Sequence, residues 1–449
     1  MPCSEKITEY LEQVCGQVRW HKAHSVIRRE LEDHLLDQAQ AFEDEGHSPE
    51  KAAEMAVLEM GDPVMIGTQF DRSYRPQFHW PILVTALFLI GFVLLARTMM
   101  YAQNGMLTPI SDTLFALLIS AGVLLTVLKI DYTILSRTWL IYGGYLTGLV
   151  LFWLLSLSHG RWVLLLSYYK ITVAPLVCAS LAYHYRNGGL VRLYLCLLLC
   201  FVPLAFALGL MGPLLWGAMT FSVVLIVALT SGAFPKVMLR GFVIFGLGTM
   251  FPSCYAAVLM LLPEDRLALR MNVFFPQRDP EGYGYLGMMV REALSQAKWF
   301  GSAENFSEIV LPVSGVDYLL TWTICRFGWI CLVGALLLLC MIAVFGIRMY
   351  RRQHGVLARM VLAGVYSVWG AQAISSLLVN LGFCTMFSYP FPFFGGNVAL
   401  IFNSVLLGLL LSVCQMGTLG TALANSGGTA PLQVRFARNR RSLDIKIKW

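Results

Sequence analysis

A series of long apolar segments between residues 77 and 418 constrains this chain more than any other feature. A helix needs about twenty residues to cross the hydrocarbon core of a bilayer, and backbone groups in lipid must pair within the segment. The sequence therefore predicts an all-α polytopic membrane protein of about ten transmembrane helices, the fourth being short. The ten runs lie at about 80–100, 113–129, 139–157, 171–184, 190–209, 212–230, 239–262, 318–347, 355–382 and 394–416.

The distribution of charge divides the chain into two environments. Charged residues make up 13% of the 449 residues, against about a quarter in soluble domains, and they concentrate in residues 1–76. The first apolar run begins only near Trp80, so we expect no signal peptide. The net charge of +7 comes largely from short loops and from the tail. Because no basic stripe is interleaved with exposed aromatic residues, we expect no nucleic-acid partner.

Residues 1–76 predict a small cytoplasmic helical domain, which we call the head. Ile27, Leu31, Leu35 and Phe42 recur at helical spacing. Two further helix starts are predicted by paired signals, in which a capping side chain precedes proline at the first helical position. These starts are Ser48-Pro49 and Asp62-Pro63. We expect a regulatory or docking role for the head, without catalysis.

Basic residues in the loops predict the orientation. Only Arg161 and Lys170 lie in the short loops of one side, whereas nine basic residues lie on the other. Those nine are Lys129, Arg137, Arg186, Arg192, Lys236, Arg240, Arg348, Arg351 and Arg352. Since cytoplasmic loops carry the excess of Lys and Arg, we expect both termini and the basic tail 419–449 in the cytoplasm. The membrane domain 77–418 then has a large extracytoplasmic loop at 263–317.

Short motifs in the loops resemble, in order, those of one family. The large outer loop holds Arg270-Met-Asn-Val-Phe-Phe-Pro, Asp279-Pro-Glu-Gly-Tyr-Gly-Tyr285 and Leu311-Pro-Val-Ser-Gly-Val-Asp-Tyr318. Other loops hold Ile130-Asp-Tyr132, Arg161-Trp162, Asn380-Leu-Gly382 and Tyr389-Pro-Phe-Pro-Phe-Phe-Gly-Gly396. With these motifs the membrane part resembles the SEDS family (FtsW/RodA/SpoVE) of bacterial cell-wall glycosyltransferases. The head resembles the helical prefix modules of some bacterial membrane proteins.

The resemblance implies polymerisation of lipid II, an undecaprenyl-pyrophosphate-linked disaccharide-peptide, at the outer face of the bacterial cytoplasmic membrane. It implies a class B penicillin-binding protein as partner and a role in division, elongation or sporulation. The acidic residue of the family's LPxxxTDF motif corresponds to Asp317, which would deprotonate the attacking sugar hydroxyl. A carboxylate at the lipid–water boundary has a raised pKa, as a general base requires. The alternative is that Asp317 caps the next helix.

The remaining candidate site residues would bind the lipid-linked substrate. Arginine pairs two phosphate oxygens at once, so Arg161, Trp162 and Arg270 are candidates for the pyrophosphate and lipid neck. Trp162 also suits an interfacial belt, and Arg270 an ordinary loop charge. The family motifs add Asp279, Gly282, Gly284, Tyr285, Asn380, Gly395 and Gly396, of which the glycines also suit simple turns.

Cofactors are indicated less directly. A divalent cation such as Mg²⁺ or Mn²⁺ could screen the pyrophosphate, but no carboxylate cluster marks a place for it. The cysteines show no spacing typical of a structural metal site. Cys196 and Cys200, for example, lie inside one apolar run, so we expect the cysteines to be small buried hydrophobic residues.

Departures from the family pattern keep two other functions open. Val313 and Val316 replace the family's Glu and Thr, and Cys325-Arg326 replaces a Glu pair that we expect to be buried. A SEDS-fold scaffold or regulator of wall synthesis is the first alternative. The second is a transporter of a lipid-linked substrate, although the spans contain few of the charged or broken-helix features that transporters use.

Overall fold

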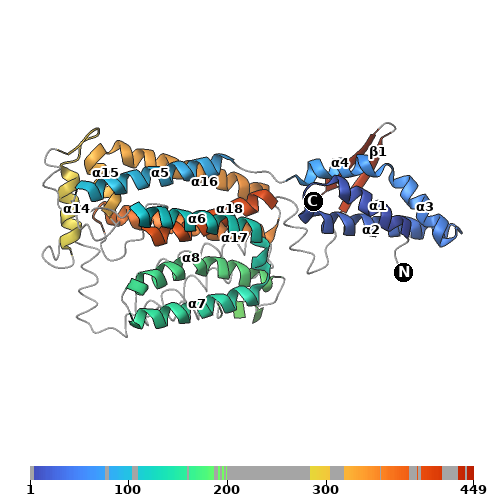
Figure 1. The fold of residues 1–449 in the computed structure, drawn as a ribbon, viewed down its shortest axis with the longest axis horizontal. Helices are drawn as coiled ribbons and strands as arrows, with labels where there is room; N and C mark the ends of the chain where they lie inside the picture. The colour runs from blue at the N-terminus through green and yellow to red at the C-terminus, as the bar shows by residue number, and fades with distance from the viewer. Residues whose placement is uncertain are drawn as a thin grey trace. The chain divides into compact units, whose positions relative to one another are not determined.

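The computed structural model describes the chain in two compact units (Figure 1). One comprises Met1–Phe78, Gln353–Gly355 and Cys414–Trp449, and the other His79–Arg352 and Val356–Val413. The described residues are 5–75, 80–103, 110–158, 161–186, 284–303, 318–353, 355–383, 396–416, 433–439 and 442–448, with isolated positions at 191, 192, 195, 196, 199 and 392.

The head is a cluster of four helices. They are α1 (Glu5–Gln17), α2 (His21–Asp44), α3 (Pro49–Met60) and α4 (Pro63–Tyr74). Both predicted helix starts are confirmed, since Ser48 and Asp62 are N-cap residues followed by proline, but the Ser48 side chain makes no cap bond. The Asp62 side chain accepts a hydrogen bond from the backbone N–H of Val64 at 3.2 Å, which satisfies one of the free donors at the start of α4.

The head core follows the predicted periodicity at three of its four positions. Ile27, Leu31 and Leu35 are almost completely buried along one face of α2, whereas Phe42 is only partly buried. Helix α1 packs against both α2 and α4, and the buried Ile7 of α1 and Phe70 of α4 complete the core. Burying side chains of this size stabilises a domain by about 1.5–3 kcal/mol each relative to exposure, so the apolar stripe of α2 organises the head.

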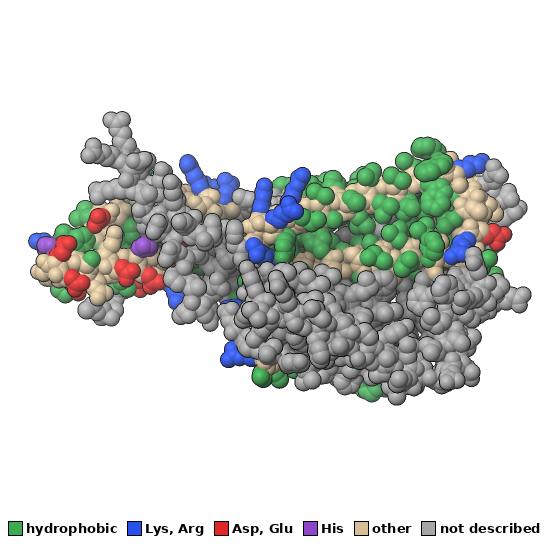
Figure 2. Space-filling model, turned by 180° about the vertical axis from the view of Figure 1, so that it is seen from behind, with side chains coloured by type: hydrophobic (Ala, Val, Ile, Leu, Met, Phe, Trp, Pro, Cys, Tyr) green, Lys and Arg blue, Asp and Glu red, His purple; other side chains and the backbone are tan. Residues whose placement is uncertain are grey.

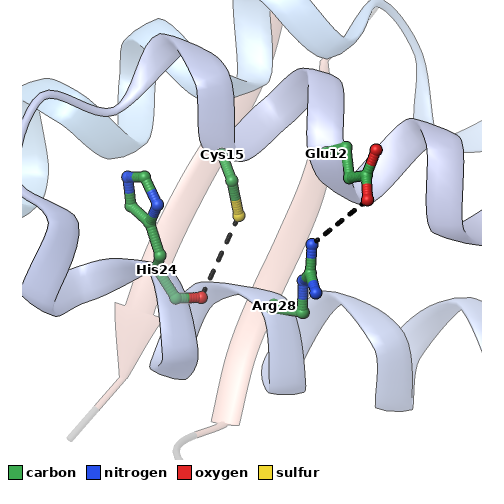
Figure 3. A network of polar contacts seen from close by, with 4 residues as sticks. All are labelled: Glu12, Cys15, His24 and Arg28. Carbon is green, nitrogen blue, oxygen red and sulfur yellow. Dashed lines mark hydrogen bonds and ion pairs between the residues drawn. The ribbon is translucent and has the colours of Figure 1, made fainter.

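Figure 3 shows polar contacts between α1 and α2. The Cys15 thiol lies 3.9 Å from the carbonyl oxygen of His24, and Arg28 lies 3.9 Å from the Glu12 carboxylate. Burial raises the pKa of Cys15, so this thiol is neutral at physiological pH and unreactive. The Arg28–Glu12 pair is about half exposed and adds little to stability.

The stability of the head is expected to depend on pH through Glu30. Burial raises its pKa to about 7, an effect that the Tyr74 hydroxyl partly offsets and Asp33 increases. An unfolded Glu titrates near pH 4.3, so between these values the native state holds a proton that the unfolded state releases. Stability therefore falls as pH rises through this window. Glu30→Gln should flatten the dependence and stabilise the head at pH 8 by about 1–2 kcal/mol, allowing for partial exposure.

The measurement is thermal unfolding of a fragment ending at Phe78, followed by circular dichroism between pH 5 and 8. Asp37→Asn, an exposed change on the same helix, is the matched control and should keep the wild-type pH profile. A Glu30→Gln profile as steep as that of the wild type would contradict the assignment.

A β-hairpin lies in the basic tail, where the all-α prediction placed no strand. Strand β1 (Gln433–Asn439) pairs antiparallel with β2 (Ser442–Lys448), Gln433 lying opposite Lys448. The physical reason is the period-two alternation of apolar residues in SLDIKIK, which suits a strand and not a helix. The other described elements of secondary structure are helices, as predicted.

The membrane unit contains helices that Figure 1 shows running side by side. Helices α17 and α18 bury most of their residues inside the protein, whereas α7 and α16 bury only a small share of theirs. On the face shown in Figure 2, hydrophobic side chains cover the coloured part of the membrane unit, and Lys and Arg side chains lie toward its two ends, as lipid and interface require. The helices are α5 (Trp80–Gln103), α6 (Ile110–Ile130), α7 (Thr138–Ser158), α8 (Arg161–His184), α14 (Tyr285–Ser295), α15 (Leu319–Phe327), α16 (Ile330–Arg352), α17 (Val356–Asn380) and α18 (Asn397–Met416), with the 3₁₀ turn η1 (Tyr132–Ser136).

The chain is a multi-pass helical membrane protein. Within the described residues, five helices are long and apolar enough to span a bilayer, namely α5, α7, α16, α17 and α18, and α6 contains a shorter apolar stretch. The predicted runs at 190–209, 212–230 and 239–262 fall outside the described residues, apart from a few positions near 195. The count of about ten spans stays a prediction.

Two predicted runs differ from the structure. The short fourth run, 171–184, belongs to a helix that begins ten residues earlier at Arg161, because the charges at its start and at Lys170 interrupt the hydropathy but not the helix. The eighth run, 318–347, is two helices, α15 and α16, separated at Gly328. Gly328 has φ +96°, and a Cβ there would lie 2.5 Å from the Trp299 carbonyl oxygen. Only glycine tolerates both conditions.

Candidate functional site

A buried hydrogen-bond network joins α15 to α17. Asn380, the last residue of α17, and Thr321 on α15 are both completely buried. The Asn380 Oδ1 accepts hydrogen bonds from the backbone N–H and the hydroxyl of Thr321, each at 2.9 Å. The Asn380 Nδ2 donates to the backbone oxygen of Ser376 at 2.9 Å. This bridge fixes the start of α15, which begins two residues after Asp317, against the end of α17.

Helix α14 packs against the same end of α17. Gly382 has φ +73°, and a Cβ there would lie 2.7 Å from the carbonyl oxygen of Gly287 on α14. The Arg291 Nε donates to the Gly382 carbonyl oxygen at 3.0 Å, and its guanidinium lies 5.3 Å from the centre of the Phe383 ring. Glycine permits this close approach, which explains the Asn-Leu-Gly motif structurally. We call this end of the membrane unit the α14 end.

The segment after α14 covers the break between α15 and α16. The backbone N–H of Gly301 donates to the Phe327 carbonyl oxygen at 3.1 Å, and that of Ala303 donates to the Cys325 carbonyl oxygen at 2.8 Å. The backbone N–H of Trp329 in turn donates to the Lys298 carbonyl oxygen at 3.1 Å. The described part of the large loop is therefore held by backbone hydrogen bonds onto the helix that follows Asp317.

Arg97 of α5 contacts Asn397, the first residue of α18, although the two residues are 300 positions apart in the sequence. Its Nη1 donates to the Asn397 Oδ1 at 2.8 Å. Helix α18 lies beside α17, since the Trp369 indole N–H donates to the Asn403 Oδ1 at 2.9 Å. Arg97 is the only charged residue in the first apolar run, a signal that sequence reasoning left unused although intramembrane charges usually mark function.

Several predicted site residues are placed by their backbone at helix starts. Arg161 and Trp162 form the first turn of α8, and Gly284 and Tyr285 open α14, where Tyr285 is half exposed. Gly396 precedes α18, and its carbonyl oxygen accepts from Leu400. Asp317, Arg270, Asp279, Gly282 and Gly395 lie outside the described residues, so their roles stay predictions.

One expectation about the helix after Asp317 is corrected, and another stays open. The N-cap residue of α15 is Tyr318, with no side-chain cap bond, and Asp317 lies outside the described residues, so both roles considered for Asp317 stay predictions. The Cys325-Arg326 pair was expected to be a buried substitution, but only Cys325 is buried and Arg326 is exposed. A basic side chain is tolerated there because it points away from the packed face of α15.

The Asp131-Tyr132 motif lies at the other end of the helices. Asp131 has φ +68°, a strained conformation for a residue with a side chain. Tyr132 is 1% exposed and donates its backbone N–H to the Ser412 hydroxyl at 2.9 Å, near the end of α18. Nearby, Ser180 near the end of α8 donates to the carbonyl oxygen of Leu135. The motif therefore joins the ends of α6, α8 and α18.

Metal ligands are not gathered in the part of the chain that the structure describes. Within it, no group of three or more His, Cys, Asp or Glu side chains could hold an ion, so nothing there fits the expected Mg²⁺ or Mn²⁺. The described cysteines are free thiols, and most are buried, in agreement with their interpretation as small hydrophobic residues.

Comparison with known proteins identifies the fold. No protein-family model and no curated protein matches the sequence. The structure is similar, with a TM-score of 0.56, to a chain from a study of the structural coordination of polymerization and crosslinking by a peptidoglycan synthase complex. The match covers 76% of this chain and 98% of the other at 18% identity. The protein is thus a polytopic helical membrane protein with the fold of a chain from a peptidoglycan synthase complex.

Proposed function

We propose that the protein is a peptidoglycan glycosyltransferase that polymerises lipid II at the outer face of a bacterial cytoplasmic membrane. The observation that carries the proposal is the fold similarity, which extends over 98% of a chain from a peptidoglycan synthase complex. The ordered SEDS-like motifs in the loops support the same function independently of the fold.

In the proposed mechanism, Asp317 is the general base. It takes the proton from the sugar hydroxyl that attacks the anomeric carbon of the donor, and the undecaprenyl pyrophosphate leaves. The rigid start of α15 supports this role, since a base must be held within hydrogen-bond reach of its proton. The Asn380–Thr321 bridge holds that start four residues after Asp317. Arg161, Trp162 and Arg270 bind the pyrophosphate and lipid neck in this proposal, and Asp279, Gly282 and Gly395 line the substrate path.

The partner in this proposal is a class B penicillin-binding protein that crosslinks the new strand. The test is polymerisation of labelled lipid II by the purified protein, with and without such a partner. Glycan strands are the expected product. A folded protein that binds the partner but makes no polymer would instead be a scaffold or regulator, which the replacements at Val313 and Val316 favour.

The proposed orientation predicts an accessible α14 end. Ser302 is exposed in the segment after α14, and the nine basic residues in the opposite loops predict that this loop lies outside the cell. Ser302→Cys should therefore react with a membrane-impermeant maleimide in intact spheroplasts, whereas Arg351→Cys should react only after permeabilisation. The wild-type chain provides the background labelling of the native cysteines. Labelling of Arg351→Cys alone in intact spheroplasts would reverse the orientation.

A further inference from the structure

A short turn after α14 presents two large aromatic side chains on the surface of the membrane unit. Trp299 is 69% exposed and Phe300 is 73% exposed, and Lys298 before them is exposed as well. Aromatic side chains of this size contribute most of their stabilising effect when they are covered. Two adjacent ones on a surface therefore mark a place that contacts something apolar.

The backbone of this turn is held against the start of α16. The carbonyl oxygens of Lys298 and Trp299 accept hydrogen bonds from the backbone N–H groups of Trp329 and Ile330, at 3.1 and 3.3 Å. These N–H groups lie at the beginning of α16, where a helix offers them no partner of its own. Because the backbone is fixed in this way, the exposure of the two aromatic side chains is built into the fold.

The turn lies at one end of an apolar stripe on α16. This helix is a candidate membrane span that buries only a small share of its residues, and exposed apolar side chains recur along it at helical spacing. They are Ile330, Val333, Leu337, Met341, Val344 and Ile347. A stripe of this kind on a spanning helix faces lipid. Its first residue, Ile330, bonds to the Trp299 carbonyl oxygen, so the aromatic pair lies next to a lipid-facing surface.

The length of α16 places the turn at the depth of the lipid headgroups. The 23 residues of this helix extend about 35 Å, slightly more than the hydrocarbon core of roughly 30 Å. Arg351 and Arg352 end the helix and belong in the headgroup region of one surface, so its first residue lies near the opposite boundary. Figure 1 shows α14 lying across the ends of the helices there, as expected of a segment at the membrane surface.

We infer that Trp299 and Phe300 insert into the interfacial region of the bilayer and anchor the turn after α14 to lipid. Tryptophan is enriched at this depth because its amphipathic ring suits the boundary between acyl chains and headgroups. Lys298 can extend its ammonium group to a lipid phosphate while its apolar stem stays beside the aromatic rings. The anchor fixes the height of α14 relative to the membrane surface. The inference holds for either orientation of the chain, and whether or not the protein polymerises lipid II.

The test introduces a photoreactive p-benzoylphenylalanine at Phe300 of the full chain, reconstituted in nanodiscs of phosphatidylglycerol and phosphatidylcholine. Mass spectrometry after irradiation measures the yield of covalent lipid adducts on the protein. The matched control has the same photoreactive residue at Glu292, an exposed position on α14. The variant at Phe300 should give about tenfold more lipid adduct than the control, because an interfacial aromatic residue contacts acyl chains and an exposed carboxylate stays in water.

A second variant carries the photoreactive residue at Trp299, so that the test stays informative if the variant at Phe300 folds poorly. Both side chains are exposed, and size-exclusion chromatography identifies the folded protein. Lipid adducts at either position, well above the yield at Glu292, support the anchor. A lipid yield within twofold of the control in folded protein would overturn the inference. Adducts with a second copy of the chain in place of lipid would also overturn it and assign the aromatic pair to a protein interface.

Discussion

Replacing Asp317 by Asn is expected to lower polymerisation of lipid II by about 10²–10⁴-fold, the usual contribution of a positioned general base. Asn keeps the size and hydrogen-bonding capacity of the side chain but cannot accept the proton. Expression, membrane insertion and binding of the transpeptidase partner should be unchanged. The measurement is the initial rate of glycan-strand formation from labelled lipid II by the purified variant.

The matched control is Glu292→Gln, which neutralises an exposed carboxylate on α14 and should keep the wild-type rate. A helix-capping role for Asp317 predicts a different result, because Asn caps a helix nearly as well as Asp. An active Asp317→Asn enzyme would therefore rule out the general base.

The second large effect is expected on the free energy of unfolding of the membrane unit. Two substitutions on α17 test it. Asn380→Leu should destabilise the membrane unit by about 3 kcal/mol or more, because it leaves the Thr321 N–H and other buried groups without partners. Gln372 is also completely buried, but neither of its amide atoms has a hydrogen-bond partner. Gln372→Leu should therefore be neutral or stabilising by about 1–2 kcal/mol.

Thermal unfolding of the detergent-solubilised chain, with size-exclusion chromatography as a check on folding, distinguishes the two variants. They share one helix and lose similar amide groups, so each controls for the volume and polarity change of the other. If Gln372→Leu were as destabilising as Asn380→Leu, the Gln372 amide would be bonded to a buried water or a ligand.

Only part of the candidate site could be predicted from the sequence. The order of the motifs predicted that Arg161-Trp162, the Gly284-Tyr285 turn, Asn380 and Gly396 serve one function, and the structure places each of them at the start or end of a helix. The environment of Asn380 could not be predicted, since its partner Thr321 lies 59 residues away. A motif gives residue types and spacing, but hydrogen bonding and burial depend on the neighbouring helix.

Sequence alone determined the helical class of the membrane unit, the helices of the head and their starts at Ser48 and Asp62. These features depend on hydropathy, period and capping, which act over one or two helical turns. Only the tertiary structure decided the break at Gly328 and the contact between Arg97 and Asn397. The break depends on the Trp299 carbonyl oxygen, and the contact joins residues 300 positions apart. Local sequence patterns do not predict which distant segment will pack against a helix, because that packing depends on the whole fold.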